Sequence, residues 1–228
     1  MGYYSSMIIL VPAIILTFLA QSKVNSTFRR FSRVAASTGM TGAQAADIIL
    51  RANGLSIPIQ PIAGNLTDNY NPVKKTLNLS QSVYAASSVA AIGVAAHECG
   101  HAIQDANSYA ALKFRNSIVP VVNFGSRLSW PILMVGLIFS GELGDMLFTF
   151  GVLLFGLTVL FHLVTLPVEL NASKRAMAQL EQLEILTDSS ELRGARKVLS
   201  AAAMTYMASL AMAIANLLRI LAMRNNRR

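Results

Sequence analysis

One short stretch of the chain, residues 94–104 (VAAHECGHAIQ), has residue types and a spacing that could do chemistry. It contains His97, Glu98 and His101 in the order H-E-x-x-H. On an α-helix, residues four apart project from one face about a turn apart, so both imidazoles can bind one metal ion. Glu98 is placed to take a proton from water on that ion, as in the zinc peptidases that carry this motif. The motif predicts a zinc site with Glu98 as the general base.

The alternative is that these side chains are ordinary polar residues on an apolar helix. Residues 88–96 are rich in Ala, Val and Ile, which predicts a buried helix, and a buried His-Glu-His cluster needs partners or a metal to offset its desolvation. Two of the chain's three histidines lie in this motif. Cys99 lies in it too, but its side chain points away from the His97/His101 face and is interpreted as a packing residue.

A third metal ligand has to come from elsewhere in the chain. A hydrolytic zinc site has three protein ligands and a water, and two histidines with one glutamate are a standard set. The candidates are His162, Cys99 and the eleven acidic residues. Glu169 is favoured because it lies at the mouth of an apolar run, where a lone carboxylate is costly unless a cation or metal balances it. His162, two turns deeper in that run, is the alternative ligand, or else a packed or hydrogen-bonded histidine.

The composition is that of a membrane protein. Of the 228 residues, 54% are hydrophobic and 13% are charged, and the mean hydropathy is +0.50, which is too apolar for an ordinary soluble domain. The net charge of +8 comes from Lys and Arg spread beside apolar runs, a pattern that indicates membrane topology and not nucleic-acid binding. We therefore expect membrane lipid, and no nucleic acid, among the partners. The single cysteine excludes an intramolecular disulfide.

Apolar runs separated by polar segments predict several membrane crossings. We expect transmembrane spans at residues 1–20, 117–140 and 147–168, and a helix at residues 201–223 that crosses the membrane or packs along it. Residues 21–116 then form a catalytic region with the H-E-x-x-H helix, and residues 169–200 complete the zinc site. The first span is interpreted as a retained anchor, because no Lys or Arg precedes it as in a cleaved signal peptide.

A small insertion with mixed secondary structure precedes the metal helix. Thr41 is a candidate cap for a short amphipathic helix over residues 41–53. Residues 57–66 and 74–79, with the turn-rich TDNYNP between them, predict a β-hairpin. An edge strand of this hairpin could receive a substrate backbone, or the hairpin could be purely structural. Asp105, four residues after His101, could orient that imidazole or be a solvated residue at the helix end.

Four separated motifs carry a family resemblance: LTDNYNP (66–72), HECGHAIQ (97–104), LPVELNASKRA (166–176) and AAAMTYMA (201–208). Together they resemble the YugP-like family of bacterial membrane neutral zinc metallopeptidases, and more distantly the HtpX-type membrane metallopeptidases. The resemblance implies that a glutamate downstream of the metal helix completes the zinc site, and that glutamate is Glu169 here. HtpX-type enzymes have an aspartate four residues further on, where this chain has Ser173, with Asn171 nearby.

The sequence thus predicts a mainly α, multi-pass membrane protein with a zincin-like metal helix and a small α/β (β-hairpin) insertion. We expect a gluzincin-like zinc endopeptidase that acts on a protein or peptide, with Zn²⁺ on His97, His101 and Glu169. Tyr206, Tyr70 or His162 could stabilise the oxyanion. The rivals are a catalytically inactive scaffold or metal-sensing protein that retains the zinc site, and a transporter. Intact Glu98 argues against a purely structural or sensing site.

The distribution of charge predicts the side of the membrane on which the site lies. Lys and Arg are frequent in residues 21–116 and 169–200, whereas the loop 141–146 has none and carries Glu142 and Asp145. By the positive-inside rule the catalytic side is cytoplasmic, in a bacterial plasma membrane as the resemblance implies. The basic tail with Arg224, Arg227 and Arg228 disagrees if the last helix crosses the membrane.

Overall fold

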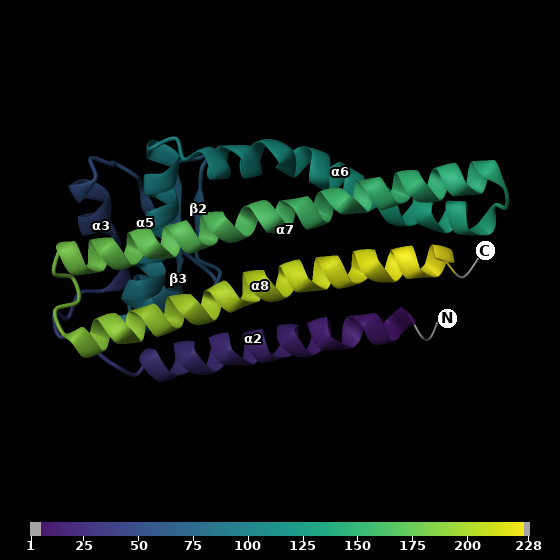
Figure 1. Cartoon of the computed structure of the whole chain (residues 1–228). Coiled ribbons are helices and arrows are strands. Elements are labelled where there is room, and N and C mark those ends of the chain that lie inside the picture. The colour runs from purple at the N-terminus through teal and green to yellow at the C-terminus, as the bar shows by residue number, and fades with distance from the viewer. Residues whose placement is uncertain (1–5, 226–228) are drawn as a thin grey trace. The chain divides into compact units, whose positions relative to one another are not determined.

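The chain is built mainly of α-helices, with one small sheet (Figure 1). The computed structural model describes residues 6–225. Its elements are η1 (Ile8–Leu10), α2 (Val11–Phe31), α3 (Gly42–Ala52), β1 (Ile59–Ile62), β2 (Asn69–Asn71), β3 (Thr76–Ser80), α4 (Gln81–Tyr84), α5 (Val89–Ala106), α6 (Ala110–Ile138), α7 (Glu142–Gln182) and α8 (Ser189–Asn225). The chain divides into two compact units, one of residues 1–20, 113–167 and 205–228, the other of residues 21–112 and 168–204. The predicted mainly α fold is confirmed.

Within residues 6–225, four helices are long and apolar enough to cross a membrane: Ile8–Phe31, α6, α7 and α8. At 1.5 Å per residue, the 41 residues of α7 extend about 60 Å, roughly twice the hydrocarbon thickness of a bilayer. The apolar run 147–168 is therefore only part of a helix, which continues to Gln182 because residues 168–182 contain no Gly or Pro. The predicted boundaries of the membrane spans themselves stay predictions.

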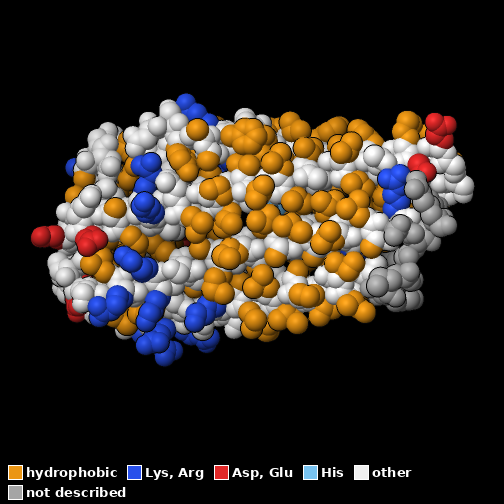
Figure 2. Space-filling view, viewed as in Figure 1, with side chains coloured by type: hydrophobic (Ala, Val, Ile, Leu, Met, Phe, Trp, Pro, Cys, Tyr) orange, Lys and Arg blue, Asp and Glu red, His pale blue; other side chains and the backbone are white. Residues whose placement is uncertain are grey.

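The unit formed by residues 1–20, 113–167 and 205–228 exposes much apolar surface. Its buried apolar cluster contains Leu133, Phe148, Phe155 and Ile220. Many other large apolar side chains of its helices are exposed, among them Phe18, Phe124, Ile138 and Leu153. On the face shown in Figure 2, hydrophobic side chains cover much of the surface. Such a surface is expected where helices contact lipid.

The small sheet has the strand order β1-β3-β2. β2 pairs with β3 in antiparallel fashion, with Tyr70 opposite Leu77, whereas β1 pairs with β3 in parallel, with Ile59 opposite Leu77. The predicted hairpin between residues 57–66 and 74–79 is therefore wrong in its pairing. The turn-rich TDNYNP segment contains a strand of its own, and the hairpin turn falls after it, where Lys75 has a φ of +51°. β1 and β2 are the two edges of the sheet.

Helix α5 runs through the core of the unit formed by residues 21–112 and 168–204. Its Ala-rich sequence packs against large apolar side chains from α3, β3, α7 and the segment before α8, including Ile49, Leu77, Leu180 and Leu186. Thr41 caps α3 through a capping box with Gln44, as predicted. Cys99 is fully buried with its Sγ 3.7 Å from the carbonyl oxygen of Ala46. Burial, and then the charge of Glu98, raise the pKa of this thiol, so it packs and does not act as a thiolate.

Candidate metal centre

Helix α5 presents the two histidines of the motif on one face. The helix begins after Ser88, whose Oγ accepts a hydrogen bond from the backbone N–H of Ala91 at 3.2 Å, and it runs on to Ala106. The ring centroids of His97 and His101 lie 4.9 Å apart. Their side chains are 12% and 11% exposed, so both rings are nearly buried. The predicted helix, with both imidazoles on one face, is confirmed.

Gly100 allows helix α7 to approach α5 closely beside these histidines. A Cβ added at Gly100 would lie 2.5 Å from the carbonyl oxygen of Ala172, a separation at which one of the two helices would have to move. Ala172 is fully buried and follows Glu169 by three residues, almost one helical turn. Because Gly100 has no side chain, the turn of α7 that carries Glu169 can pack directly against the turn of α5 that carries the two histidines.

His97, His101 and Glu169 form a cluster whose ligand atoms all lie within 4.8 Å of one another. The Oε2 atom of Glu169 is 3.3 Å from Nε2 of His97 and 3.3 Å from Nε2 of His101. A tetrahedral zinc ion with bonds of about 2.0–2.1 Å holds its ligand atoms about 3.3–3.4 Å apart. The donor types and these two separations fit zinc. His162, the alternative third ligand, does not belong to this cluster.

The carboxylate of Glu169 also changes the electrostatics of the histidine pair. Burial by itself lowers the pKa of His101. The hydrogen bond to Glu169 and the negative charges of Glu98 and Glu169 outweigh burial, so the pKa of His101 lies above its ordinary value. The negative charge of Glu169 therefore stabilises a positive charge located between the His97 and His101 rings. A metal cation placed among the three side chains would receive the same stabilisation.

Gln104 orients the imidazole of His101 from its outer side. The Nδ1 atom of His101 lies 3.0 Å from Oε1 of Gln104. The amide nitrogen of Gln104, which is fully buried, donates to the carbonyl oxygen of Val168 at 2.8 Å and to Oδ1 of Asn171 at 2.9 Å. Because both amide hydrogens are used there, the oxygen of Gln104 must accept the hydrogen from Nδ1 of His101. The Nε2 lone pair of His101 then points to the cluster.

Arg175 fixes the direction of this hydrogen-bond chain at its far end. Its Nε donates to Oδ1 of Asn171 at 2.8 Å, and a guanidinium has no acceptor. The Asn171 atom in contact with Gln104 is therefore its oxygen, which in turn defines the orientation of the Gln104 amide. Sequence reasoning missed Gln104, although its position three residues after His101 places both on one helix face.

Ser173 contacts Nδ1 of His97, as Gln104 contacts Nδ1 of His101. Its Oγ lies 3.1 Å from Nδ1 of His97, and Nε2 of His97 is the atom that faces Glu169. HtpX-type enzymes have a carboxylate at this position of the motif, and here a neutral hydroxyl contacts the histidine. Both histidines therefore have neutral hydrogen-bond partners at Nδ1, namely Ser173 and Gln104. The carboxylates of Glu169 and Glu98 both act on the charge of His101.

Glu98 is held by the edge strand β2. Glu98 is 8% exposed, and its Oε2 accepts a hydrogen bond from the backbone N–H of Tyr70 at 3.0 Å. Tyr70 of β2 lies opposite Leu77 of β3, and the backbone N–H of Leu77 donates away from β2, to the carbonyl oxygen of Pro58. Tyr70 and Leu77 are therefore a pair without mutual backbone hydrogen bonds, and the N–H of Tyr70 points outward from the sheet edge. The outer edge of β2 consequently faces the carboxylate that the motif predicts as the base.

Tyr70 and Asp105 have structural partners other than the predicted ones. The hydroxyl of Tyr70 donates to Oδ2 of Asp105 at 2.7 Å, and the ammonium of Lys75 forms an ion pair with the same oxygen. Burial, with the hydrogen bond to Asp105, raises the pKa of Tyr70. Asp105 therefore clamps β2 and its turn onto α5, and the described partner of Nδ1 of His101 is Gln104.

The remaining candidates for oxyanion stabilisation stay predictions. Tyr206 and His162 belong to the unit formed by residues 1–20, 113–167 and 205–228, and the metal cluster belongs to the other unit. The hydroxyl hydrogen of Tyr70 is engaged by Asp105, so this side chain would have to break that bond to donate to a substrate oxygen.

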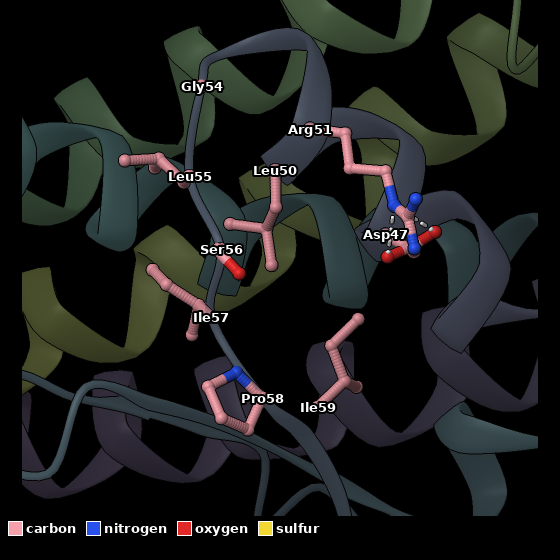
Figure 3. A pocket seen from close by; sticks show the side chains of 9 residues that line it. All are labelled: Asp47, Leu50, Arg51, Gly54, Leu55, Ser56, Ile57, Pro58 and Ile59. Atoms are coloured by element: carbon pink, nitrogen blue, oxygen red, sulfur yellow. Dashed lines mark hydrogen bonds and ion pairs between the residues drawn. The ribbon is translucent and has the colours of Figure 1, made fainter.

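A separate cavity of about 640 Å³ lies along the opposite edge of the sheet, near Ile59 of β1 (Figure 3). Its charged residues are Asp47 and Arg51, which form an exposed ion pair with each other at 2.8 Å. The residues that line it include no histidine, cysteine or glutamate. Pro61 also removes a backbone donor from this edge. The lining of this cavity therefore lacks the histidines of the predicted zinc site, and β2 is the sheet edge that lies next to the metal cluster.

The fold and the site together define a class of protein. Four helices could cross a membrane, and a buried His/His/Glu cluster compatible with zinc joins an H-E-x-x-H helix to a long apolar helix. These are the features of a membrane-associated zinc peptidase.

Comparison with known proteins leads to the same class. Residues 6–225 match the family described as "Putative neutral zinc metallopeptidase", and the chain belongs to this family. The chain is 46% identical over 210 residues to the "Putative membrane protease YugP" of Bacillus subtilis (strain 168), a match that covers 92% of each protein. No solved structure is significantly similar to the chain. The resemblance drawn from the four sequence motifs is confirmed.

Proposed function

We propose that the protein is a membrane-embedded, zinc-dependent endopeptidase. The observation that carries the proposal is the separation of 3.3 Å between Oε2 of Glu169 and each histidine Nε2, which suits tetrahedral zinc. His97, His101 and Glu169 would hold the ion, and a fourth position would stay open for water or substrate. Membership of the zinc metallopeptidase family and the similarity to a membrane protease support it.

The bound zinc would supply Lewis-acid polarisation of the scissile carbonyl and activation of a water molecule. Glu98 would be the residue that takes a proton from that water and delivers it to the leaving amine. Its Oε2 is held by the backbone N–H of Tyr70. In the described part of the chain, Oε1 of Glu98 has no hydrogen-bond donor and is the atom available for proton transfer.

We further propose that the substrate is a protein or peptide that lies extended beside β2. Strand addition uses free backbone groups of a sheet edge, and the outer edge of β2 faces Glu98 at Tyr70. The clamp formed by Tyr70, Asp105 and Lys75 keeps this short strand in place against α5. The strand then defines where the scissile bond lies relative to the base.

The proposed location is a bacterial plasma membrane, with the active site on the cytoplasmic side. Four long apolar helices and the name of the bacterial relative support the membrane assignment. The orientation rests on the many Lys and Arg residues in the segments around the metal cluster, and on their absence from residues 141–146, where α7 begins. Membrane lipid is therefore a partner, and nucleic acid is not.

Incubation of the purified protein with an unfolded soluble protein and an unfolded membrane protein tests the proposal. We expect cleavage that stops on chelation and returns when zinc is added. The matched variant is Glu98→Gln, which has the same shape and keeps an oxygen for the N–H of Tyr70. It should retain one zinc per chain by elemental analysis and lose at least about 10²-fold in rate. A wild-type protein that binds zinc but cleaves neither substrate would instead support the inactive scaffold or metal sensor.

A further inference from the structure

A second cavity, of about 460 Å³, lies between α2 and α8 and is lined by positive charge. Its cations are Lys23 and Arg30 of α2 together with Arg193, Arg196 and Lys197 of α8, and no Asp or Glu lines it. All five side chains are exposed. In Figure 2, blue Lys and Arg side chains gather over the part of this face where α2 and the beginning of α8 lie. We call this feature the basic cavity.

The five cations of the basic cavity are not neutralised by carboxylates. In the described chain, none of them has a carboxylate oxygen within ion-pair distance. Arg193 donates to Oγ of Ser189 at 3.0 Å. The hydrogen bonds from Ser190, and to a smaller extent the charge of Arg193, lower the pKa of the exposed Asp188 carboxyl. Arg30 lies over the ring of Phe31, 5.5 Å from its centroid. Five like charges around one cavity repel each other, so an anion bound there is stabilised by all of them.

The basic cavity also has an apolar side. Phe31, Ala201 and Met204 line it beside the cations. On α2 the cations begin three residues after Ala20, the end of an uncharged apolar run, and on α8 they stop four residues before Ala201, where the next apolar run begins. In both helices the cavity therefore falls where apolar sequence changes to polar sequence. For helices that cross a membrane, this change marks the border between hydrocarbon and headgroups.

We propose that the basic cavity binds the phosphate headgroup of an anionic membrane phospholipid. Arginine is suited to phosphate because its planar fork donates two parallel hydrogen bonds, and the cavity contains three arginines. The apolar side chains fit the glycerol and first acyl carbons that follow the phosphate in a lipid, which a free phosphate ion lacks. The site is distinct from the metal centre, and the proposal does not depend on peptidase activity.

Lipid retention by the full chain tests this site. The protein is purified in detergent, mixed with equal amounts of dioleoylphosphatidylglycerol and dioleoylphosphatidylcholine, and examined by native mass spectrometry. We expect preferential retention of phosphatidylglycerol, and a loss of about 10- to 30-fold in its apparent affinity in the double variant Arg193→Gln/Arg196→Gln. The matched control Arg51→Gln/Lys74→Gln removes two exposed cations of the same unit outside the basic cavity and should bind like the wild type.

Three further measurements distinguish a lipid site from a folding defect or a simple phosphate site. The charge-conserving variant Arg193→Lys/Arg196→Lys should recover most of the binding, and the zinc content of every variant reports whether the metal-site unit has folded. Inorganic phosphate at millimolar concentration should not displace the lipid. Equal retention of both lipids by the wild type, equal retention of phosphatidylglycerol by the cavity and control variants, or displacement by inorganic phosphate alone would each overturn the proposal.

Discussion

The oxygen of the buried Gln104 amide lies 3.0 Å from Nδ1 of His101, on the side of the ring opposite the metal cluster. This contact fixes the His101 tautomer through a chain that ends at Arg175, which can only donate. Outer partners of metal-binding histidines typically change metal affinity by 10- to 100-fold. Gln104→Leu should therefore weaken zinc binding by about that factor, as measured by competition with a chromophoric chelator.

Asp105→Asn is the matched control for this prediction. Asp105 follows Gln104 directly on α5, and its carboxylate accepts from Tyr70 and pairs with Lys75. Zinc affinity should stay within about twofold of the wild type in this variant. A loss of zinc from Asp105→Asn, with normal binding by Gln104→Leu, would show that the aspartate is the residue that orients the ring.

Glu169 is expected to be the third zinc ligand. Glu169→Gln replaces the charged oxygen with a neutral amide of the same shape, so the contact with both histidines can remain while the charge is lost. We expect zinc content after dialysis to fall well below one ion per chain. His162→Gln, on the same helix seven residues earlier, should keep its zinc. The opposite pattern would assign the third ligand to His162.

The approach of α7 to α5 at Gly100 should limit what this position tolerates. In Gly100→Ala the new methyl group meets the carbonyl oxygen of Ala172, and the backbone that carries Glu169 has to move. We expect weaker zinc binding and a destabilisation of about 1–3 kcal/mol, the usual range for overpacking. Thermal unfolding with and without zinc measures both effects.

Gly93→Ala, on the same helix, provides the comparison. A Cβ at Gly93 would lie 3.5 Å from Cβ of Ala195, an ordinary van der Waals contact. Because Ala favours a helix by up to about 1 kcal/mol over Gly, this variant should be as stable as the wild type or slightly more so. Similar effects of the two substitutions would mean that helix propensity, and not the close approach at Ala172, governs position 100.

Zinc binding should strengthen as the pH rises. Only the neutral imidazole can bind the metal, and the pKa of His101 without metal lies above its ordinary value because Glu169 and Glu98 outweigh burial. Protons therefore compete with zinc up to a higher pH than for a free histidine, and affinity is lost as the pH falls through that raised pKa. Titrations between about pH 5 and 8 should show this trend. An affinity that does not change over this range would contradict it.

The part of the site that the sequence predicts best is the part formed by local spacing. His97 and His101 share a face because they are one turn apart in one helix, and the helix itself is indicated by its Ala-rich run and its cap at Ser88. Glu169 could be proposed because a carboxylate beside an apolar run is unusual and the family motif surrounds it. The structure brings it to the histidines across 68 residues of sequence from His101.

Features that depend on contacts between elements were predicted less well. The turn residues between 57–66 and 74–79 are compatible with a hairpin. Strand pairing, however, depends on which strand edges come together in the fold, and β1 pairs with β3 in parallel. The end of the apolar run at Val168 marks a change of polarity and not the end of α7, because the following residues also favour a helix. The partners of Gln104 and Asp105 could not be predicted, because Val168, Asn171 and Tyr70 come from other elements.

The last prediction concerns the side of the membrane on which the metal cluster lies. If the first span leaves residue 21 on one side, residues 21–116 stay there. The connection between α6 and α7, with the first turn of α7 (residues 141–146), then lies opposite, and the third span returns Glu169 to the starting side. This number of crossings places His97, His101 and Glu169 on the same side of the membrane, as their cluster requires. Since Lys and Arg are frequent on this side and absent from residues 141–146, we expect it to be cytoplasmic.

Cysteine labelling in intact cells tests this orientation. Cys99 is fully buried and can be replaced by Ala, after which single cysteines are placed at Ser108, next to the metal helix, and at the exposed Leu143 in the first turn of α7. A membrane-impermeant maleimide should label Leu143→Cys from outside and Ser108→Cys only after lysis. A third cysteine at Asn226 tests whether α8 crosses the membrane. Labelling from outside means that it does, although the basic tail favours the cytoplasmic side, and protection means that it does not. Labelling of Ser108→Cys in intact cells would overturn the cytoplasmic active site.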